Sequence, residues 1–326
     1  MINLMVYAIA IPSIVVCGCA WLLSSRVYLL DMLVSQQMVL AWWALGVLVA
    51  LVIMRRWKIA MLALVMCVLA FYPVVHGRTL WLPEVDFASK PEGVIRVVSC
   101  NFNPENELWE QALLDLMAMD ADVVVLLEVP PEITRKIHRE DWVGSDDYKY
   151  WIHRKWVENS ASPGFILSRW PIKQIENAQG VERPEIILHA EIVYPTGSFI
   201  VGLMHPSSPR TEERWRSGNS ATQIQALAAA HSRSQSRLPV LIGADVNAGV
   251  AQYRSRILRA SGMHPTKPLS RPRGTFPSSG PICDVFSVAI DDVWSDGDLE
   301  IYAWSMAEIT GSDHRAIAVN FRLNHR

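Results

Sequence analysis

The sequence predicts an α/β domain in which two mixed β-sheets pack together with helices outside, preceded by three transmembrane helices. Residues 94–127 have the pattern of a β-α-β unit, and further short apolar segments follow with helical patterns between only some of them. Long uncharged apolar runs occupy the first 75 residues. The 326-residue chain therefore divides into a membrane region at 1–75, a linker at 76–93 and a globular domain at 94–326.

The membrane region contains three apolar runs. Residues 4–23 form a run of 20 residues without a charge, and residues 38–54 and 59–75 form two runs of 17 residues each. A spanning helix needs about 20 mainly apolar residues, and about 17 is near the lower limit. Buried helices of a soluble protein, or a cleaved signal peptide at the first run, are the alternatives. Three runs in succession with short charged links favour membrane spans.

The charges between the runs predict an orientation. Arg55, Arg56 and Lys58 lie between the second and third runs. The positive-inside rule places this link in the cytoplasm, so that the chain after residue 75 emerges on the outer face. We therefore expect a multi-pass protein of the cell membrane, with the bilayer as a partner and the globular domain extracytoplasmic. The stretch 76–93 contains Pro83 and Pro91 and has no clear period, as expected of a linker.

The elements of the globular part follow from apolar periodicity. The segment 94–101 alternates and begins β-branched, 123–127 is wholly apolar as in a strand covered on both faces, and 107–119 has helical spacing. Further helices are expected at 219–231 and 253–260. Further strands are expected at 164–167, 186–194, 199–204, 240–243, 289–294, 299–305 and 316–322.

Polar residues follow several of these strands at the end where ligand sites of such sheets gather. Asn101 and Glu128 follow the two strands of the β-α-β unit. Glu128 is a candidate ligand for a hard cation such as magnesium, which takes carboxylate oxygen and keeps several waters; the alternative is a surface Glu at a strand end. Asp245 and Asn247 are two apart, so in an extended chain they face the same way, although an Asx turn is also common for such a pair.

The order of several short strings carries a family resemblance. They are Ser-Cys-Asn at 99–101, Leu-Leu-Glu at 126–128, Gly-Phe-Ile-Leu-Ser-Arg-Trp-Pro-Ile at 164–172, Ala-Asp-Val-Asn at 244–247, Ile-Asp-Asp at 290–292 and Gly-Ser-Asp-His-Arg-Ala at 311–316. With them, residues 94–323 resemble the endonuclease/exonuclease/phosphatase superfamily, which implies a DNase I-like four-layer α/β sandwich of two packed mixed sheets. Three spans ahead of such a domain look like its teicoplanin-resistance (VanJ-type) branch.

The resemblance also implies roles for individual residues. Metal binding falls to Glu128, Asn101 and Asp313, with magnesium as the cofactor and manganese as an alternative. Phosphate contacts fall to Asn101, His205, Asn247 and His314, and catalysis to His205, Asp245, Asn247, Asp291 and His314. In the family the Asp corresponding to Asp245 orients or deprotonates the attacking water, or protonates the leaving group. His314 would stabilise charge on the phosphoryl group, with Asp291 holding its ring.

The chain departs from the family pattern at two positions. Ala244 stands where the family usually has Gly, and Asp292 where it usually has His or Tyr. Asp284 is a rival for the role of Asp291. On local grounds His205 is equally well explained as a turn residue before Pro206.

Charge balance and the absence of certain motifs argue against several other functions. Residues 82–326 contain 25 basic and 31 acidic residues, a net charge of −6, which argues against strong nucleic-acid binding but leaves a small phosphate substrate open. The sequence has no Cys-x-x-Cys pair, Gly-x-Ser-x-Gly elbow, phosphate-cradling Gly-rich loop ending in Lys or His-Glu-x-x-His motif.

We therefore expect a membrane-anchored, magnesium-dependent phosphoesterase acting outside the cytoplasmic membrane, on a phosphate-containing substrate such as the lipid-linked undecaprenyl pyrophosphate. The alternatives are an extracytoplasmic nuclease or phosphodiesterase and a catalytically silent, membrane-tethered binding module.

Overall fold

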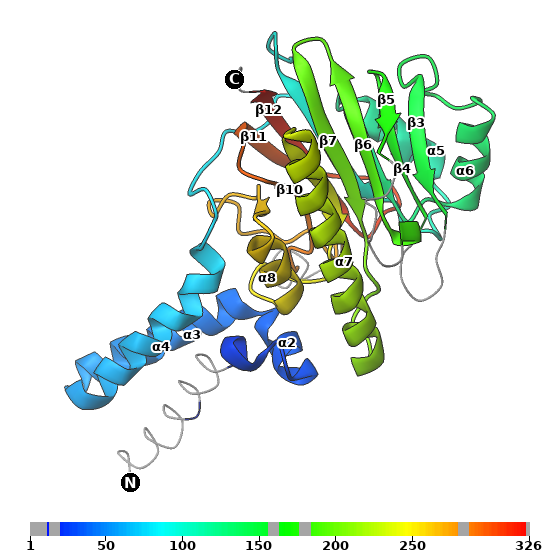
Figure 1. Cartoon of the computed structure of the whole chain (residues 1–326). Coiled ribbons are helices and arrows are strands. Elements are labelled where there is room, and N and C mark those ends of the chain that lie inside the picture. The colour runs from blue at the N-terminus through cyan, green and yellow to red at the C-terminus, as the bar shows by residue number, and fades with distance from the viewer. Residues whose placement is uncertain (1–11, 13–19, 156–162, 176–183, 280–286, 324–326) are drawn as a thin grey trace. The chain divides into compact units, whose positions relative to one another are not determined.

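Two units that alternate along the sequence make up the chain (Figure 1). The computed structural model describes residues 12, 20–155, 163–175, 184–279 and 287–323. A helical unit comprises residues 1–77 together with the short segment 248–256. A globular unit comprises residues 78–247 and 257–326.

The helical unit contains a helical hairpin. Helix α3 (Gln37–Ile53) and helix α4 (Trp57–Val75) pack against each other, and a shorter helix, α2 (Tyr28–Val34), precedes them. Among the described residues, α4 alone is long and apolar enough to cross a membrane by itself, and α2 with α3 qualifies only as a pair bent by 76°. The predicted run at 4–23 lies largely outside the described residues, so the three-helix bundle stays a prediction.

The first sheet of the globular unit has six strands in the order β11-β12-β1-β2-β4-β3. Strands β1 and β2 are parallel and joined through helix α5 (Trp109–Met117), which confirms the predicted β-α-β unit; all other pairs are antiparallel. The strands are β1 (Ile95–Asn101), β2 (Val123–Leu127), β3 (Tyr150–Arg154), β4 (Gly164–Ser168), β11 (Leu299–Glu308) and β12 (Arg315–Leu323).

The second sheet also has six strands, in the order β5-β6-β7-β8-β10-β9. Strands β7 and β8 are parallel and joined through the long helix α7 (Glu212–Ser236), and the other pairs are antiparallel. The strands are β5 (Ile172–Gln174), β6 (Leu188–Tyr194), β7 (Gly197–Met204), β8 (Val240–Asp245), β9 (His264–Pro265) and β10 (Asp291–Ser295). Helix α8 (Tyr253–Ala260) follows β8, and a short 3-10 helix, η1 (Pro184–Ile186), precedes β6.

The two sheets pack face to face and helices cover their outer faces (Figure 1). The central apolar cluster joins side chains of both sheets, such as Val125 of the first and Leu241 of the second. Helix α5 and the amphipathic helix α6 (Pro131–His138) cover the first sheet, and α7 covers the second. The predicted architecture of two packed mixed sheets with helices outside is confirmed.

Several elements differ from the sequence prediction for physical reasons. Strand β3 was not predicted because it is an edge strand whose residues are mostly half-exposed and do not alternate. Helix α6 was not predicted because it has only eight residues and an apolar face limited to Ile133 and Ile137. Helix α7 begins earlier than expected because the Thr211 side chain caps it by accepting the N–H of Arg214. The stretch 76–93 contains no helix or strand, yet Leu82 and Val85 are buried.

Candidate active site

The sheet topology brings six of the predicted site residues to one end of the sandwich. The parallel pairs β1/β2 and β7/β8 end there, whereas β10 and β12 run antiparallel to β8 and β1 and so begin there. Asn101, Glu128, His205 and Asp245 lie at the four strand ends, and Asp291 and His314 lie at the two strand beginnings. Hydrogen bonds and close contacts connect all six.

Two buried carboxylates hold a histidine at the centre of the site. His314 Nδ1 lies 2.8 Å from Asp291 Oδ2 and 3.8 Å from Asp245 Oδ2. Asp245 and Asp291 are opposite each other in the β8–β10 register, which fixes the separation of their backbones. All three side chains are buried, so water screens their charges little. The role predicted for Asp291, holding the His314 ring, stays a prediction.

The charges in this group shift the pKa values of its members in opposite directions. Burial would lower the pKa of His314, but the neighbouring Asp291 and Asp245 charges and the Asp291 hydrogen bond raise it to about 10. Burial would raise the pKa of Asp245, but the His205 hydrogen bond and the charge of His314 lower it to about 2. At neutral pH the His314 ring is therefore a cation and Asp245 is an anion.

His205 links the two sheets of the site. Its Nε2 atom lies 3.2 Å from Glu128 Oε1, 3.4 Å from Asp245 Oδ2 and 3.2 Å from Asn247 Nδ2. The interpretation of His205 as a turn residue alone does not account for these contacts. Its Nδ1 atom is buried and has no hydrogen-bond partner within the described part of the chain.

Two of the site residues have left-handed backbone conformations. Glu128 and Asn247 both have φ of 50°. This region costs about 1 kcal/mol or more for a residue with a side chain and is concentrated at functional sites. In Asn247 the turn lets the backbone N–H donate to Asp245 Oδ1 at 2.8 Å, while the side-chain amide donates to the Pro206 carbonyl at 3.1 Å. The Asx turn is therefore present, and the functional role of Asn247 stays a prediction.

Asn101 supports the carboxylate of Asp245. Its side-chain NH2 donates to Asp245 Oδ2 at 3.1 Å, its side-chain oxygen accepts the N–H of Asn103, and its backbone carbonyl accepts the Ser312 hydroxyl. The amide thus joins β1 of the first sheet to β8 of the second.

The oxygen-rich donor set suits a hard divalent cation. Asp245, Asp291 and His314 offer ligand atoms that all lie within 4.8 Å of one another. A protonated imidazole cannot bind a metal. Because the pKa of His314 is raised, the carboxylates are the better candidate metal ligands. Glu128, half-buried at the end of β2, adds a third carboxylate beside His205. Asp313 is half-buried, and its charge contributes to raising the pKa of His314. Its role as a metal ligand stays a prediction.

The structure adds supporting residues that the sequence did not indicate. Thr275 Oγ1 accepts the backbone N–H of Asp291, and the Phe276 ring lies against His314 with ring centroids 4.7 Å apart. Arg315 holds the same loop by donating to the carbonyls of Gly274 and Ser278. These loop residues show no helical or strand periodicity, and the only sequence feature that marks the loop is its abundance of Pro and Gly.

Asp292, which stands where the family usually has His or Tyr, makes structural hydrogen bonds. Its carboxylate accepts the Thr266 hydroxyl at 2.8 Å and the backbone N–H of Lys267 at 3.0 Å. It therefore ties β10 to the segment after β9. The rival candidate Asp284 lies outside the described residues.

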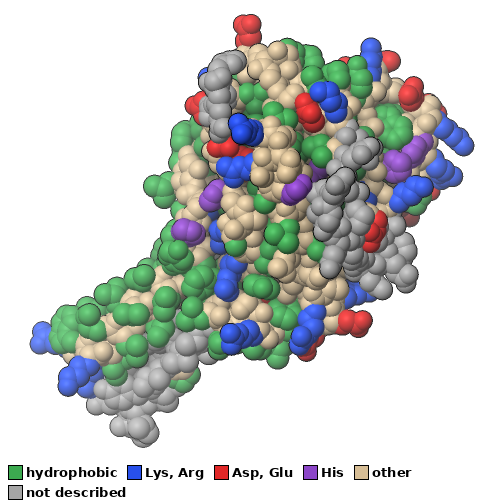
Figure 2. All heavy atoms as spheres, viewed as in Figure 1, with side chains coloured by type: hydrophobic (Ala, Val, Ile, Leu, Met, Phe, Trp, Pro, Cys, Tyr) green, Lys and Arg blue, Asp and Glu red, His purple; other side chains and the backbone are tan. Residues whose placement is uncertain are grey.

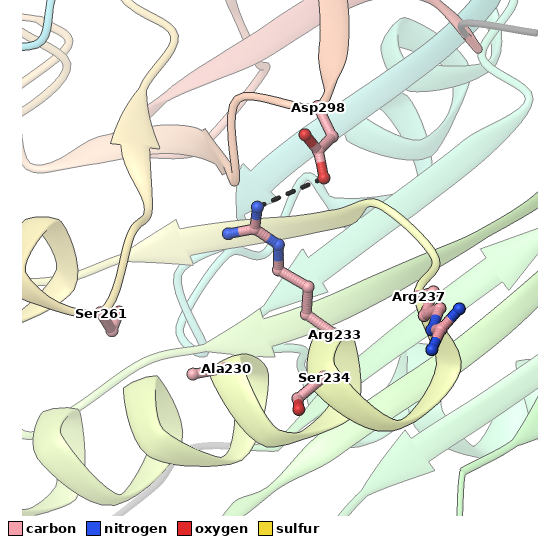
Figure 3. Close-up of a pocket in the computed structure, with 6 residues that line it drawn as sticks. All are labelled: Ala230, Arg233, Ser234, Arg237, Ser261 and Asp298. Atoms are coloured by element: carbon pink, nitrogen blue, oxygen red, sulfur yellow. Dashed lines mark hydrogen bonds and ion pairs between the residues drawn. The ribbon is translucent and has the colours of Figure 1, made fainter. Parts of the chain in front are cut away.

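A separate pocket lies near the carboxyl-terminal end of α7 (Figure 3). Its lining residues are Ala230, Arg233, Ser234, Arg237, Ser261 and Asp298. Arg233 points toward Asp298 and pairs with it at 3.3 Å, and it also pairs with Asp296. The pocket contains none of the candidate site residues, and acidic partners balance the charge of Arg233.

Comparison with solved structures identifies the fold. No protein-family model matches the sequence, and no curated protein matches it. Among solved structures, an endonuclease/exonuclease/phosphatase family protein from Bacteroides thetaiotaomicron superposes with a TM-score of 0.51 at 14% identity, covering 73% of this chain and 100% of that one. The human Nocturnin catalytic domain with bound sulfate superposes at 0.50 and 13% identity, covering 70% of this chain and 93% of that one.

A third similar structure is D. rerio TDP2 complexed with a single-strand DNA product, with a TM-score of 0.50 and 13% identity, covering 71% of this chain and 100% of that one. These structures cover 70–73% of this chain, which is about the share that the globular unit occupies. The globular unit therefore has the DNase I-like fold of the endonuclease/exonuclease/phosphatase proteins.

Proposed function

We propose that this protein is a membrane-anchored, divalent-metal-dependent phosphoesterase. The observation that supports this most strongly is the convergence of Glu128, Asp245 and His314 with their amide and imidazole partners at one end of the sandwich. These residues come from distant parts of the sequence, and their burial and mutual contacts are costly without a function that uses them. The shared fold with phosphatase and nuclease proteins supports the same reaction class.

The carboxylates and the histidine cation have separate tasks in this proposal. Glu128, with Asn101 and Asp313 as the other members of the predicted ligand set, would hold magnesium or manganese, which would neutralise charge on a phosphoryl group. Asp245, whose pKa is about 2, is a weak base, so it orients the attacking water by accepting its hydrogen bond. His314 donates from its second ring N–H to a phosphoryl oxygen as negative charge develops.

Asn247 and His205 complete the proposed phosphate site. The Asn247 amide is held against the Pro206 carbonyl and His205, so its position is fixed before a substrate arrives. His205 lies between Glu128 and Asp245, and in this proposal its imidazole contacts a phosphoryl oxygen of the substrate. Such preorganisation avoids reorganisation cost at the moment of reaction.

The packing of the helical hairpin supports a membrane anchor. The residues buried between α3 and α4 are mostly small, whereas large apolar side chains are exposed. The buried residues of the two helices are Gln37, Ala41, Ala44, Leu51, Ala60, Ala63, Cys67, Ala70, Pro73 and Val74. The exposed set includes Trp42, Trp43, Val49, Ile53, Met61, Leu64, Val65 and Val68. Small residues at helix contacts with apolar residues outside are typical of helices in lipid, and Figure 2 shows the apolar surface of the hairpin.

An interhelical hydrogen bond strengthens this interpretation. The Gln37 side chain donates to the Ala70 carbonyl at 2.9 Å, so its buried amide is satisfied inside the helix pair. Arg55 and Lys58 are exposed at the turn between the helices. We propose that this turn is cytoplasmic, which leaves the globular unit on the outer face of a cell membrane.

A membrane anchor favours a lipid-linked substrate. Tethering raises the effective concentration of any phosphate group carried by the same bilayer. We therefore propose a lipid-linked pyrophosphate, such as undecaprenyl pyrophosphate, as the substrate. Attack of water on the terminal phosphorus would release inorganic phosphate and leave the lipid monophosphate.

The full-length protein reconstituted in lipid nanodiscs tests this proposal. With magnesium or manganese, we expect phosphate release from a polyprenyl pyrophosphate, little from lipid phosphodiesters, and none after chelation of the metal. The matched variants are Asp245→Asn, which should be inactive, and Asp298→Asn in the separate pocket, which should be fully active. If single-stranded DNA is cleaved and no lipid pyrophosphate is hydrolysed, the substrate is a nucleic acid instead. If no phosphate ester of the panel reacts, the enzymatic proposal is wrong.

A further inference from the structure

The helical unit includes a part of the chain that comes directly after the proposed active site. Residues 248–256 group with residues 1–77, although residues on both sides of them belong to the globular unit. Asn247, whose amide lies against His205, is bonded to Ala248, the first residue of this segment. The helical unit is thus connected to the catalytic chain at a second place, far in sequence from residue 77.

Specific side chains fasten the 248–256 segment within the helical unit. The buried carboxylate of Asp31, in α2, accepts the backbone N–H of Tyr253 at 2.8 Å. Arg256 donates to the Trp21 carbonyl at 2.9 Å and to the Ser24 hydroxyl at 3.1 Å. Its guanidinium also lies 5.1 Å from the centre of the Trp21 ring, within cation–π range.

Apolar packing and local hydrogen bonds reinforce these contacts. Ala251 is buried in a cluster with Ala20 and Val34. Within the segment, the Gln252 side chain accepts the N–H of Gly249 and the Ser255 hydroxyl donates to the Gly249 carbonyl. Asp31 is the only acidic residue among residues 1–81, so the one carboxylate of this apolar region serves this attachment.

From these contacts we infer that α2 is a positioning element of the active site, acting through the 248–256 segment on Asn247. The inference rests on the proposed function. Asn247 is fixed on one side by Asp245, His205 and Pro206 and continues on the other into a segment that the helical unit holds. Its backbone is left-handed, a conformation that Asn can adopt through local side-chain hydrogen bonds, so its exact placement depends on what holds the chain on each side.

The consequence is that the anchor of the protein also adjusts its catalytic geometry. A displacement of a positioned group by about 1 Å can cost roughly 100-fold in rate. Loss of the Asp31 acceptor should release Tyr253 and loosen the segment, so that kcat falls about 10- to 100-fold. KM should change little, because the other phosphate contacts come from the globular unit.

Asp31→Leu, compared with Asp31→Asn, tests the role of the carboxylate in the full-length protein in nanodiscs. Asparagine keeps a side-chain oxygen that can accept the Tyr253 N–H, so Asp31→Asn should retain most of kcat whereas Asp31→Leu should not. The control is Gln37→Leu, which removes the α3–α4 hydrogen bond without touching the 248–256 segment. Gln37→Leu should lower the unfolding temperature and leave kcat within about twofold of the wild type.

A cross-link provides a second test. A side chain at Gly249 would place its Cβ 3.8 Å from the Ser35 Cα, so cysteines at the two positions are close enough to pair. In the Asp31→Leu protein, oxidation of the Ser35→Cys, Gly249→Cys pair should restore kcat, and dithiothreitol should abolish the gain. The same oxidation of protein without the added cysteines is the control.

The outcomes separate the inference from the proposed function. Equal losses of kcat in Asp31→Leu and Gln37→Leu, or no loss in Asp31→Leu, would overturn the positioning role. If the wild type hydrolyses no phosphate ester, the proposed function fails, and the rate of cross-linking still tests the attachment. In that case the cysteine pair should oxidise more slowly with Asp31→Leu than with Asp31, and equal rates would overturn the attachment as well.

Discussion

Asp245 and Asp291 are directly opposite each other in the β8–β10 ladder, and the imidazole of His314 lies between their charges at 2.8 Å from Asp291 and 3.8 Å from Asp245. Two buried carboxylates this close would repel each other, and the cationic ring compensates for both. The same arrangement explains why His314 is protonated and Asp245 ionised at neutral pH. Much of the expected chemistry of the site follows from this relationship.

The first prediction concerns the histidine. His314→Gln keeps a hydrogen-bond donor but removes the cation, so phosphoryl charge loses its stabilisation and Asp291 loses its partner. We expect kcat to fall by about 10²- to 10³-fold. Steady-state phosphate release measures this, and circular dichroism checks that the fold is retained. A variant with kcat near the wild-type value would show that His314 has no catalytic role.

The second prediction concerns pH and stability with divalent ions chelated. The folded-state pKa of His314 is about 10, above its ordinary value of 6.5, so its stabilisation is complete below about pH 6.5 and is lost as pH rises through 10. The pKa of Asp245 is about 2, below its ordinary 3.8, so its stabilisation is complete above about pH 4 and is lost as pH falls through 2. Thermal unfolding across pH measures both limbs, and His314→Gln should flatten the alkaline one.

The third prediction tests the metal ligand. Glu128→Gln removes the charge from the half-buried carboxylate at the end of β2, so the magnesium concentration needed for half-maximal activity should rise at least tenfold. Glu132→Gln is the matched control, because Glu132 is exposed on α6 and pairs with Arg135. Titration of activity with magnesium makes the comparison. The same magnesium dependence in both variants would remove Glu128 from the metal site.

The fourth prediction concerns the contact between the sheets beneath the site. A Cβ at Gly243 of β8 would lie 2.7 Å from the Val125 Cβ of β2 and 2.9 Å from the Ser99 hydroxyl. Gly243→Ala should therefore lower the free energy of unfolding by about 1–3 kcal/mol. Adding Val125→Ala should recover part of the loss, because it removes the Cγ1 atom that would lie 2.8 Å from the new Cβ and lets the remaining Cβ shift. Chemical denaturation of the double-mutant cycle measures the coupling, and additive effects would contradict this packing.

The fifth prediction concerns the helical hairpin. Ala63 is buried at the contact between α3 and α4, so Ala63→Leu should separate the helices and destabilise the unit by about 1–3 kcal/mol. Leu64→Met, at the next position on the exposed side, should be nearly neutral. Unfolding of the full-length protein in detergent micelles measures the difference. Equal effects at both positions would indicate that the hairpin packs differently.

The order of the main elements and the residues of the candidate site could be predicted from the sequence. Apolar runs such as 123–127 predicted buried strands because burial on both faces leaves no alternation, and β2 has those bounds. The polar residues after the strands, including Asn101, Glu128 and Asp245, were found because the carboxyl ends of strands leave side chains beside a common edge.

Which of these groups meet, and how they are charged, follows from the folded arrangement of the strands. The pairing of Asp291 with His314, and of His205 with Glu128, depends on strands that lie far apart in the sequence and become neighbours through sheet order and sandwich packing. The attachment of 248–256 to α2 had no local signal either, since it depends on one carboxylate and one backbone N–H separated by more than 200 residues. Local periodicity reports burial within an element, whereas charge and contact depend on distances between elements, which the fold sets.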